Sequence, residues 1–280
     1  MDRIQAIRML SRLLLLVYLP LAALAQTTAP APTTSAKAAA ECDKHPLYAY
    51  DHGPYGQSTW CGVCNNSAER HFQAPINIPA GKPDPALPAI QFTGYNQLTS
   101  LKTTLENPNN LKVYTPVRPP SIEIYGLGKY DLEEFHFHRP SEEAVNNHRY
   151  PMVIHLVHKK PGCVTGQCAV VISVLVEEGQ PTAKTSAVLK VLFARFPPPA
   201  ADGGTPIEIE GLLPADHQNA GYYSYPGSLT TPPCTEGVTF FVLKTPIKFS
   251  PAEIEEFVRR YPLPNARDIQ ELNGRPVGNR

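Results

Sequence analysis

Proline occurs throughout this chain, at 31 of its 280 positions, and this distribution limits how long any helix can be. A proline inside a helix removes a backbone hydrogen bond and clashes with the preceding turn. The periodic stretches are instead short, and they alternate or run apolar between turn residues, which predicts strands. They are Ser121 to Tyr125, Leu132 to His138, Met152 to Val157, Ala169 to Val176 and Gly237 to Leu243. We therefore expect a mainly β fold.

Two peripheral helices are also predicted. The segment Thr182 to Phe193 has apolar residues at helical spacing. The second helix begins at Ser250, which is a favourable N-cap residue; Pro251 then takes the first helical position, and Glu253 completes a capping box. The chain shows no internal repeat and no second linker, so we expect a single domain.

One antiparallel hairpin is predicted from the strands Met152 to Val157 and Ala169 to Val176. The loop between them contains glycines and two cysteines, Cys163 and Cys168. A disulfide between these cysteines would close the loop.

The first 25 residues resemble a secretory signal peptide. Their first part contains Arg3, Arg8 and Arg12; an apolar run follows from Leu13 to Leu24, and a small-residue cleavage site ends the segment at Ala25. A membrane anchor is the alternative, but it needs about 20 apolar residues, and this run is shorter and contains Pro20. Residues 26–40 are almost wholly Ala, Thr, Pro and Ser, a composition typical of a disordered linker. The folded domain is expected over residues 41–280.

The charge balance argues against a nucleic-acid partner. Three of the 25 basic residues and one of the 25 acidic residues lie in the signal peptide, which leaves 22 basic and 24 acidic residues. Such a chain lacks the excess of positive charge that nucleic acids attract. We expect a small-molecule substrate and no stable membrane span after signal cleavage, and a homodimer is left open.

Six cysteines follow the signal peptide: Cys42, Cys61, Cys64, Cys163, Cys168 and Cys234. An even number of cysteines in an exported chain favours disulfides. Cys61 and Cys64 form a CxxC pair, which in a redox protein follows a strand and opens a helix. Here the pair lies among Gly and Asn residues, so we expect bonds to distant cysteines instead.

The segment Leu132 to His138 is the most informative for function. Side chains at positions i and i+2 of a strand point to the same face, so His136 and His138 project together while Phe135 and Phe137 point the other way. Taken alone, such a histidine pair is more often exposed or hydrogen-bonded than bound to metal. A third histidine on a neighbouring strand would favour a metal site over an ordinary histidine pair.

The strand that begins at Met152 offers two candidates for this third ligand. His155 lies mid-strand among apolar residues, where an unpaired histidine is costly. His158 points to the opposite face near the strand end, and we do not expect it to bind metal. Three neutral histidine ligands, His136, His138 and His155, would leave a zinc ion its full charge and one open position, so that a bound water becomes acidic.

Several segments resemble the alpha-class carbonic anhydrases. Residues 135–138 are similar to the FHFH segment that carries the family's first two zinc ligands, and residues 155–158 to the HLVH segment that carries the third. Residues 225–234 have the YPGSLTTPPC signature, residues 73–78 resemble a QSPI-type segment, and residues 265–272 resemble the C-terminal tail. The similarity runs from about residue 48 to the C-terminus, and the chain resembles a secreted, bacterial-like member.

The resemblance implies a lyase on a central twisted sheet of about ten mainly antiparallel strands, with Zn²⁺ at the bottom of a conical cleft. The implied reaction is the reversible hydration of carbon dioxide to bicarbonate and a proton by zinc-bound hydroxide. Thr230 matches a threonine that accepts a hydrogen bond from the hydroxide and donates one to a glutamate, here Glu142. Such a relay orients the hydroxide toward the substrate. The backbone amide of Thr230 would hold a substrate oxygen.

Further site residues follow from the same resemblance. An apolar wall suits carbon dioxide, which has no net dipole and needs a dry surface. The substrate contacts so implied are Val157, Val171, Leu229, Thr230, Thr231 and Val238, and the residues implied around the zinc site are Glu134, Asn265, Tyr50 and Tyr225. The two tyrosines match residues that order the cleft water and the threonine relay.

The resemblance also bears on the disulfides. Cys234 matches a cysteine that secreted members bridge to the N-terminal region. We favour Cys64 as its partner, which leaves Cys42 for Cys61, although sequence alone does not determine connectivity.

Two departures from the family pattern concern the residues that hold the zinc ligands. A glutamate usually stands two residues before the third ligand, and that position is Val153 here. Loss of such a partner typically costs roughly 10 to 100-fold in metal affinity or activity, unless water or a backbone carbonyl substitutes. The first ligand's usual glutamine is Glu134, whose added negative charge should bind zinc more tightly and raise the operating pH.

Two further departures lie elsewhere in the site. The position of the proton-shuttle histidine aligns with Asn109, which cannot titrate near neutral pH, so proton export would rely on water and buffer. His52 and His71 are the alternatives. Arg139 replaces a usual Trp or Thr, and Glu143 replaces a usual histidine, so we expect these two residues to pair with each other.

The leading hypothesis is an active hydratase, because all three ligands, Thr230 and Glu142 are present. The alternative is a carbonic anhydrase-like zinc-binding or scaffold protein with little catalysis, and a slow esterase activity is a third possibility. We expect a secreted or periplasmic protein, with a bacterial periplasm favoured by the short Arg-rich signal. The sequon at Asn65-Asn66-Ser67 would be glycosylated only in a eukaryotic host.

Overall fold

The computed structural model describes residues 48–51, 53–65, 70–107, 110–115, 118–164, 168–194 and 206–280. The expected signal peptide and linker, Cys42, His52, Asn109 and most of the sequon lie outside these ranges. Within them, no helix is both long enough and apolar enough to span a membrane.

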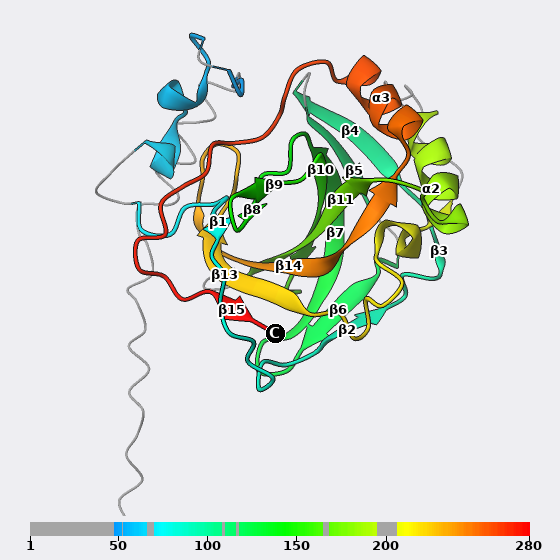
Figure 1. The fold of residues 1–280 in the computed structure, drawn as a ribbon, viewed down its shortest axis with the longest axis horizontal. Coiled ribbons are helices and arrows are strands. Elements are labelled where there is room, and N and C mark those ends of the chain that lie inside the picture. The colour runs from blue at the N-terminus through cyan, green and yellow to red at the C-terminus, as the bar shows by residue number, and fades with distance from the viewer. Residues whose placement is uncertain are drawn as a thin grey trace, which may run out of the picture. The chain divides into compact units, whose positions relative to one another are not determined.

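A curved, mixed sheet of ten strands dominates the described residues (Figure 1). Its strands are β2 (Ile90–Thr93), β4 (Lys102–Asn107), β5 (Asn110–Tyr114), β6 (Ser121–Ile124), β7 (Gly128–His138), β10 (Met152–Lys159), β11 (Ala169–Glu178), β13 (Tyr222–Ser228), β14 (Glu236–Phe249) and β15 (Gly278–Asn279). Eight of them follow the order β15-β13-β14-β11-β10-β7-β5-β4, while β6 also pairs with β7, and β2 pairs with β6. The β11–β14 pair is parallel and the other pairs in this sheet are antiparallel, which confirms the mainly β prediction.

Smaller elements surround the sheet. Two further short sheets join β1 (Asn77–Ile78), β8 (Ala144–Val145) and β9 (His148–Arg149), and β3 (Leu98–Thr99) with β12 (Ile207–Glu208). The helical elements are α2 (Ala183–Phe193), α3 (Pro251–Arg260) and the 3₁₀ turns η1 (Gln57–Thr59), η2 (Gly62–Cys64) and η3 (Ile209–Leu212). Figure 1 shows α2 and α3 next to each other beside the sheet.

The two predicted helices begin where their capping residues are. Thr182 caps α2, with its side chain accepting a hydrogen bond from the Thr185 backbone N–H. At α3, Ser250 and Glu253 form the predicted capping box and Pro251 is the first helical residue. Four of the five predicted strands lie within β7, β10, β11 and β14, and the fifth, Ser121 to Tyr125, corresponds to β6, which ends one residue earlier at Ile124.

The sheet separates two apolar clusters. The larger cluster contains Phe135 and Phe137 of β7 together with Val188 of α2 and Phe257 of α3. The smaller cluster contains Val153, Val171, Tyr225 and Val238, among others, from β10, β11, β13 and β14. Side chains alternate along each strand, so His155 and Ser173, each two residues after one of these valines, lie on the same face of the sheet as Val153 and Val171.

Two disulfides join described cysteines. Cys163 and Cys168 are bonded across the β10–β11 loop, and the two strands pair antiparallel, as predicted for this hairpin. Cys64 of η2 is bonded to Cys234, which follows β13. Cys61 is also disulfide-bonded, but Cys42, its predicted partner, lies outside the described residues.

His158 is a buried structural residue on the opposite face of β10 from His155. Its side chain is fully enclosed, and its Nε2 atom lies 2.5 Å from the Tyr95 hydroxyl oxygen. Burial lowers the pKa of His158 from 6.5 to about 3. Between about pH 3 and pH 6.5, His158 is therefore mostly neutral in the folded protein, whereas it is mostly protonated in the unfolded chain.

This difference predicts a loss of stability in acid. The contribution of His158 is fully present above its unfolded pKa of 6.5 and falls as the pH drops toward the folded pKa of about 3. In metal-free protein, the free energy of unfolding of the wild type should decrease by about 2 kcal/mol more than that of His158→Gln between pH 8 and pH 5. Urea unfolding of both proteins at the two pH values measures this; equal decreases would contradict it.

Candidate metal centre

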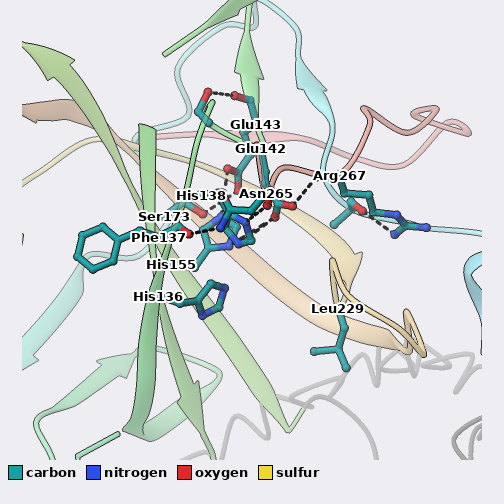
Figure 2. Close-up of polar contacts among 12 residues, drawn as sticks. His136, Phe137, His138, Glu142, Glu143, His155, Ser173, Leu229, Asn265 and Arg267 are labelled. Atoms are coloured by element: carbon teal, nitrogen blue, oxygen red, sulfur yellow. Dashed lines mark hydrogen bonds and ion pairs between the residues drawn. The ribbon is translucent and has the colours of Figure 1, made fainter. Parts of the chain in front are cut away.

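Three histidines converge from two neighbouring strands. His136 and His138 are both on β7, two residues apart, and β10 pairs with β7 so that His155 lies opposite His136. The ring centroids are 4.8 Å apart for His136–His138 and for His138–His155, and 5.5 Å apart for His136–His155. Figure 2 shows the three rings together, whereas the Phe137 side chain points away from them, as its place in the alternation requires.

Each ring has one nitrogen next to a hydrogen-bond acceptor. His136 Nδ1 lies 2.9 Å from a carboxylate oxygen of Glu134, and His138 Nδ1 lies 2.6 Å from the backbone carbonyl oxygen of Asn265. His155 Nε2 lies 3.2 Å from a carboxylate oxygen of Glu143. Because these acceptors face one nitrogen of each ring, the other nitrogen (Nε2, Nε2 and Nδ1, respectively) is left for a metal.

The donor set fits a zinc ion. One ligand atom from each histidine lies within 4.8 Å of the others, and all three residues are buried. Among the described residues, His138 Nε2 is buried without a hydrogen-bond partner, although a buried polar nitrogen needs one. Three imidazoles form a ligand set that zinc enzymes use, with a fourth position open. A zinc ion at this point would satisfy the unpaired nitrogen.

The surroundings favour different protonation states for two of the rings. Burial, together with the neighbouring His136 and His155, lowers the pKa of His138 well below its usual value, so this ring is neutral and able to bind a cation. Burial would also lower the pKa of His155, but the carboxylates around it, with Glu143 foremost, raise it. A metal ligand must be deprotonated, so a metal at this site would compete with that proton.

Glu142 lies on the metal side of the rings. One carboxylate oxygen accepts a hydrogen bond of 2.8 Å from the Arg267 backbone N–H, and the other lies 3.4 Å from His138 Nε2 and 3.7 Å from His155 Nδ1. The second of these oxygens has no hydrogen-bond partner among the described residues. Burial raises the pKa of Glu142 to about 7, against His155, the Arg267 backbone N–H and the side chain of Thr230, a buried residue of the loop between β13 and β14, which lower it.

Glu143 lies on the outer side of His155, and this corrects two expectations. It does not pair with Arg139, whose guanidinium donates instead to the Pro262 carbonyl oxygen. The second expectation was that water or a backbone carbonyl would accept the hydrogen bond of His155 in place of the missing carboxylate at position 153. The Glu143 carboxylate contacts the ring instead. Burial would raise the pKa of Glu143, but His155 and the hydrogen bond from Ser173 bring it down to about 2. Glu143 is therefore ionised.

Glu134 and Asn265 lie where the resemblance implies. Burial raises the pKa of Glu134 to about 7, against Lys112, His155 and Lys159, which lower it. Asn265 fixes the end of β7 with its side chain, which accepts from the Arg139 backbone N–H and donates to the Phe137 carbonyl oxygen. Asn265 thus keeps the end of the ligand strand in place, and Glu134 contacts the His136 ring.

The expected apolar wall is brought together in part. Val157 lies opposite Val171 in the β10–β11 pair and packs, partly buried, against the smaller apolar cluster, which contains Val171 and Val238. Leu229 is 38% exposed and lies apart from the histidine rings in Figure 2. Thr231 is half-buried in the same loop, where its carbonyl oxygen accepts from the Cys234 backbone N–H.

The two tyrosines have distinct surroundings. Tyr225 is buried, stacks on Phe240, and its hydroxyl donates to Glu143 at 3.3 Å. Tyr50 belongs to a separate aromatic group, with edge-on contacts to Tyr48 and Trp60. His71, one of the alternative proton carriers, is exposed.

Sequence reasoning missed Ser173, Arg267 and the role of Glu143. Ser173 lies on β11 and Glu143 in the loop before β8, and the fold brings the two side chains into hydrogen-bond contact. Arg267 is 125 residues from Glu142 in the sequence and contacts it through its backbone N–H. The contact of Arg267 could not be predicted, because the type of a side chain does not indicate where the backbone N–H of the same residue will donate. For Glu143 the sequence did hold a signal, because a carboxylate is missing at position 153 and an extra one stands at position 143.

This chain is similar to known proteins over most of its length. The family model described as eukaryotic-type carbonic anhydrase matches residues 55–280. The carbonic anhydrase of Neisseria gonorrhoeae is 34% identical over 73% of this chain and 76% of its own length, and that of Pectobacterium carotovorum is 33% identical over 73% and 78%. The solved alpha-carbonic anhydrase from Thermovibrio ammonificans, in complex with the inhibitor sulfanilamide, is 29% identical, with a TM-score of 0.68 over 83% of this chain and 98% of that one.

The match extends over both the sheet and the site. The matched residues include both ligand strands, the Glu142 segment and the loop that carries Thr230. The extent of the family match, the identity to bacterial enzymes and the shared architecture lead to one conclusion. The chain belongs to the eukaryotic-type, alpha-class carbonic anhydrase family.

Proposed function

We propose that His136, His138 and His155 hold the zinc ion with which this enzyme hydrates carbon dioxide reversibly to bicarbonate and a proton. The observation that carries the proposal is the convergence of three buried imidazoles, each with one nitrogen facing an acceptor, on a space where His138 Nε2 has no hydrogen-bond partner among the described residues. When bound, the ion supplies Lewis acidity that lowers the pKa of a water molecule to near neutral.

Thr230 and Glu142 orient the nucleophile in this proposal. The Arg267 backbone N–H fixes the Glu142 carboxylate beside the ligand nitrogens. The other oxygen of this carboxylate has no hydrogen-bond partner among the described residues, and we assign it to the buried Thr230. An ionised carboxylate only accepts, so above the Glu142 pKa of about 7 the hydroxyl of Thr230 donates its proton to it and keeps its oxygen free to accept from the nucleophile. This one-way arrangement selects the orientation in which a lone pair of the nucleophile faces the substrate.

Val157, Val171 and Val238 provide the surface for carbon dioxide. Their clustering on the histidine side of β10, β11 and β14 supports this role, because a substrate without a net dipole gains little from hydrogen-bond donors. We place Leu229 and Thr231 at the outer part of the substrate site, and the Thr230 backbone amide on a substrate oxygen.

We also propose that the protein is secreted or periplasmic after cleavage near residue 25. The disulfides Cys64–Cys234 and Cys163–Cys168 support an oxidising compartment, and bacterial relatives favour the periplasm. N-terminal sequencing of the protein recovered from periplasmic extract tests both the cleavage and the location.

The experiment that tests the function is stopped-flow measurement of carbon dioxide hydration with zinc content determined. We expect one zinc per chain and zinc-dependent turnover that rises with buffer concentration, because Asn109 cannot carry the proton. The pH profile should lie toward the alkaline side because Glu134 adds negative charge to His136. A protein with one zinc per chain but no hydration above background would instead support a binding or scaffold role.

A further inference from the structure

The two ligand strands differ in how they support their histidines. On β7, Glu134 lies two residues before His136 on the same face and its carboxylate contacts the ring. On β10, the corresponding position before His155 is Val153, which is fully buried in the smaller apolar cluster. A valine side chain cannot accept a hydrogen bond from the His155 ring, so β10 itself offers this ring no side-chain partner at that place.

Glu143 reaches the same ring from outside the strand. It immediately precedes β8, its side chain is fully buried, and one oxygen lies 3.2 Å from His155 Nε2. The segment is itself held, because the Ser141 hydroxyl donates to the Glu143 carbonyl oxygen at 2.7 Å and accepts from the Tyr150 backbone N–H at 2.9 Å. The carboxylate therefore approaches His155 from a fixed backbone.

Two hydroxyls from other strands fix the second carboxylate oxygen. Ser173 of β11, which lies directly opposite His155, donates at 2.7 Å, and Tyr225 of β13 donates at 3.3 Å. Both donors are neutral, so they orient the carboxylate without neutralising it, and its charge acts on the imidazole. The ring is thereby held with Nε2 toward Glu143 and Nδ1 toward the other two histidines.

We propose that Glu143 is the positioning residue of His155, and that Glu143 with Ser173 and Tyr225 replaces a carboxylate that β10 lacks at Val153. The proposal rests on the zinc site proposed above. An oriented and charged acceptor fixes the ring and makes the ligand nitrogen more basic, so it strengthens metal binding. The missing strand carboxylate and the extra loop carboxylate are then one compensated change.

The test is zinc affinity, measured on metal-free protein by competition with a chelator. Glu143→Gln keeps the shape but offers a single acceptor oxygen to three donors, and we expect zinc binding to weaken by about 10 to 100-fold. Adding Val153→Glu to this variant should restore most of the lost affinity, because residue 153 stands to His155 as Glu134 stands to His136. Ser173→Ala, which removes one donor without touching the ring, should weaken zinc binding in the same direction and by less.

A matched control separates positioning from general destabilisation. Tyr95→Phe removes a buried polar contact in the larger cluster, so it should lower the unfolding temperature of metal-free protein and leave zinc affinity unchanged. Wild-type zinc affinity in Glu143→Gln would overturn the proposal, as would a failure of Val153→Glu to restore binding that Glu143→Gln has weakened. In those cases a wild-type protein that binds zinc and hydrates carbon dioxide still retains its proposed function, whereas a wild type that binds no zinc refutes the function itself.

Discussion

Replacing His138 with alanine is expected to abolish stable zinc binding and to reduce carbon dioxide hydration to the rate of buffer alone. His138 is fully buried between the other two histidines, and its Nε2 atom has no hydrogen-bond partner among the described residues. Loss of a residue that only supports a ligand costs about 10 to 100-fold in metal affinity, so loss of a ligand should cost more than about 100-fold. Zinc content after dialysis and stopped-flow hydration measure the two effects.

His148→Ala is the matched control for this substitution. His148 is an exposed histidine of β9 whose ring contacts Tyr150, outside the group of three. It should retain one zinc per chain and the wild-type rate. Circular dichroism of His138→Ala should show a folded β protein, since the same strands remain paired. A folded His138→Ala protein that keeps stoichiometric zinc would show that the metal lies elsewhere.

Local patterns were sufficient to predict which histidines come together. The two-residue period of a strand places His136 and His138 on one face and Phe137 on the other, and this depends only on the backbone. The apolar surroundings of His155 identify it as a buried strand residue, and the same period separates it from His158. The capping box at Ser250 was equally local. Features that depend on a few consecutive residues could therefore be predicted.

Contacts between distant segments could not be predicted in the same way. His138 is held by the Asn265 carbonyl oxygen and Glu142 by the Arg267 N–H; every residue offers such a carbonyl, and every residue except proline offers such an N–H. The expected Arg139–Glu143 pair was wrong because opposite charge was the only criterion, whereas Glu143 turns into the protein toward His155. Which way a buried loop carboxylate points depends on the donors that the fold brings to it, here Ser173 and Tyr225.

Removing the Cys64–Cys234 disulfide should produce the largest loss of stability among the changes considered. The bond joins residues 170 apart in the sequence, and the chain-entropy model assigns such a loop about 5 kcal/mol of stabilisation. The double variant Cys64→Ser/Cys234→Ser avoids leaving one unpaired thiol. Its free energy of unfolding, measured in urea without reductant, should fall by about this amount.

The second described disulfide provides the matched comparison. Cys163 and Cys168 are only 5 residues apart, for which the same model gives about 2 kcal/mol, so Cys163→Ser/Cys168→Ser should be clearly less destabilised. The difference also has a functional consequence, because Cys234 lies four residues after Thr230 and the bond ties that loop to the buried Cys64. The Cys64→Ser/Cys234→Ser variant should therefore lose hydration activity at temperatures where its sheet is still folded, while the hairpin variant should not. Equal losses of stability in the two variants would show that the length of the closed loop does not determine the effect.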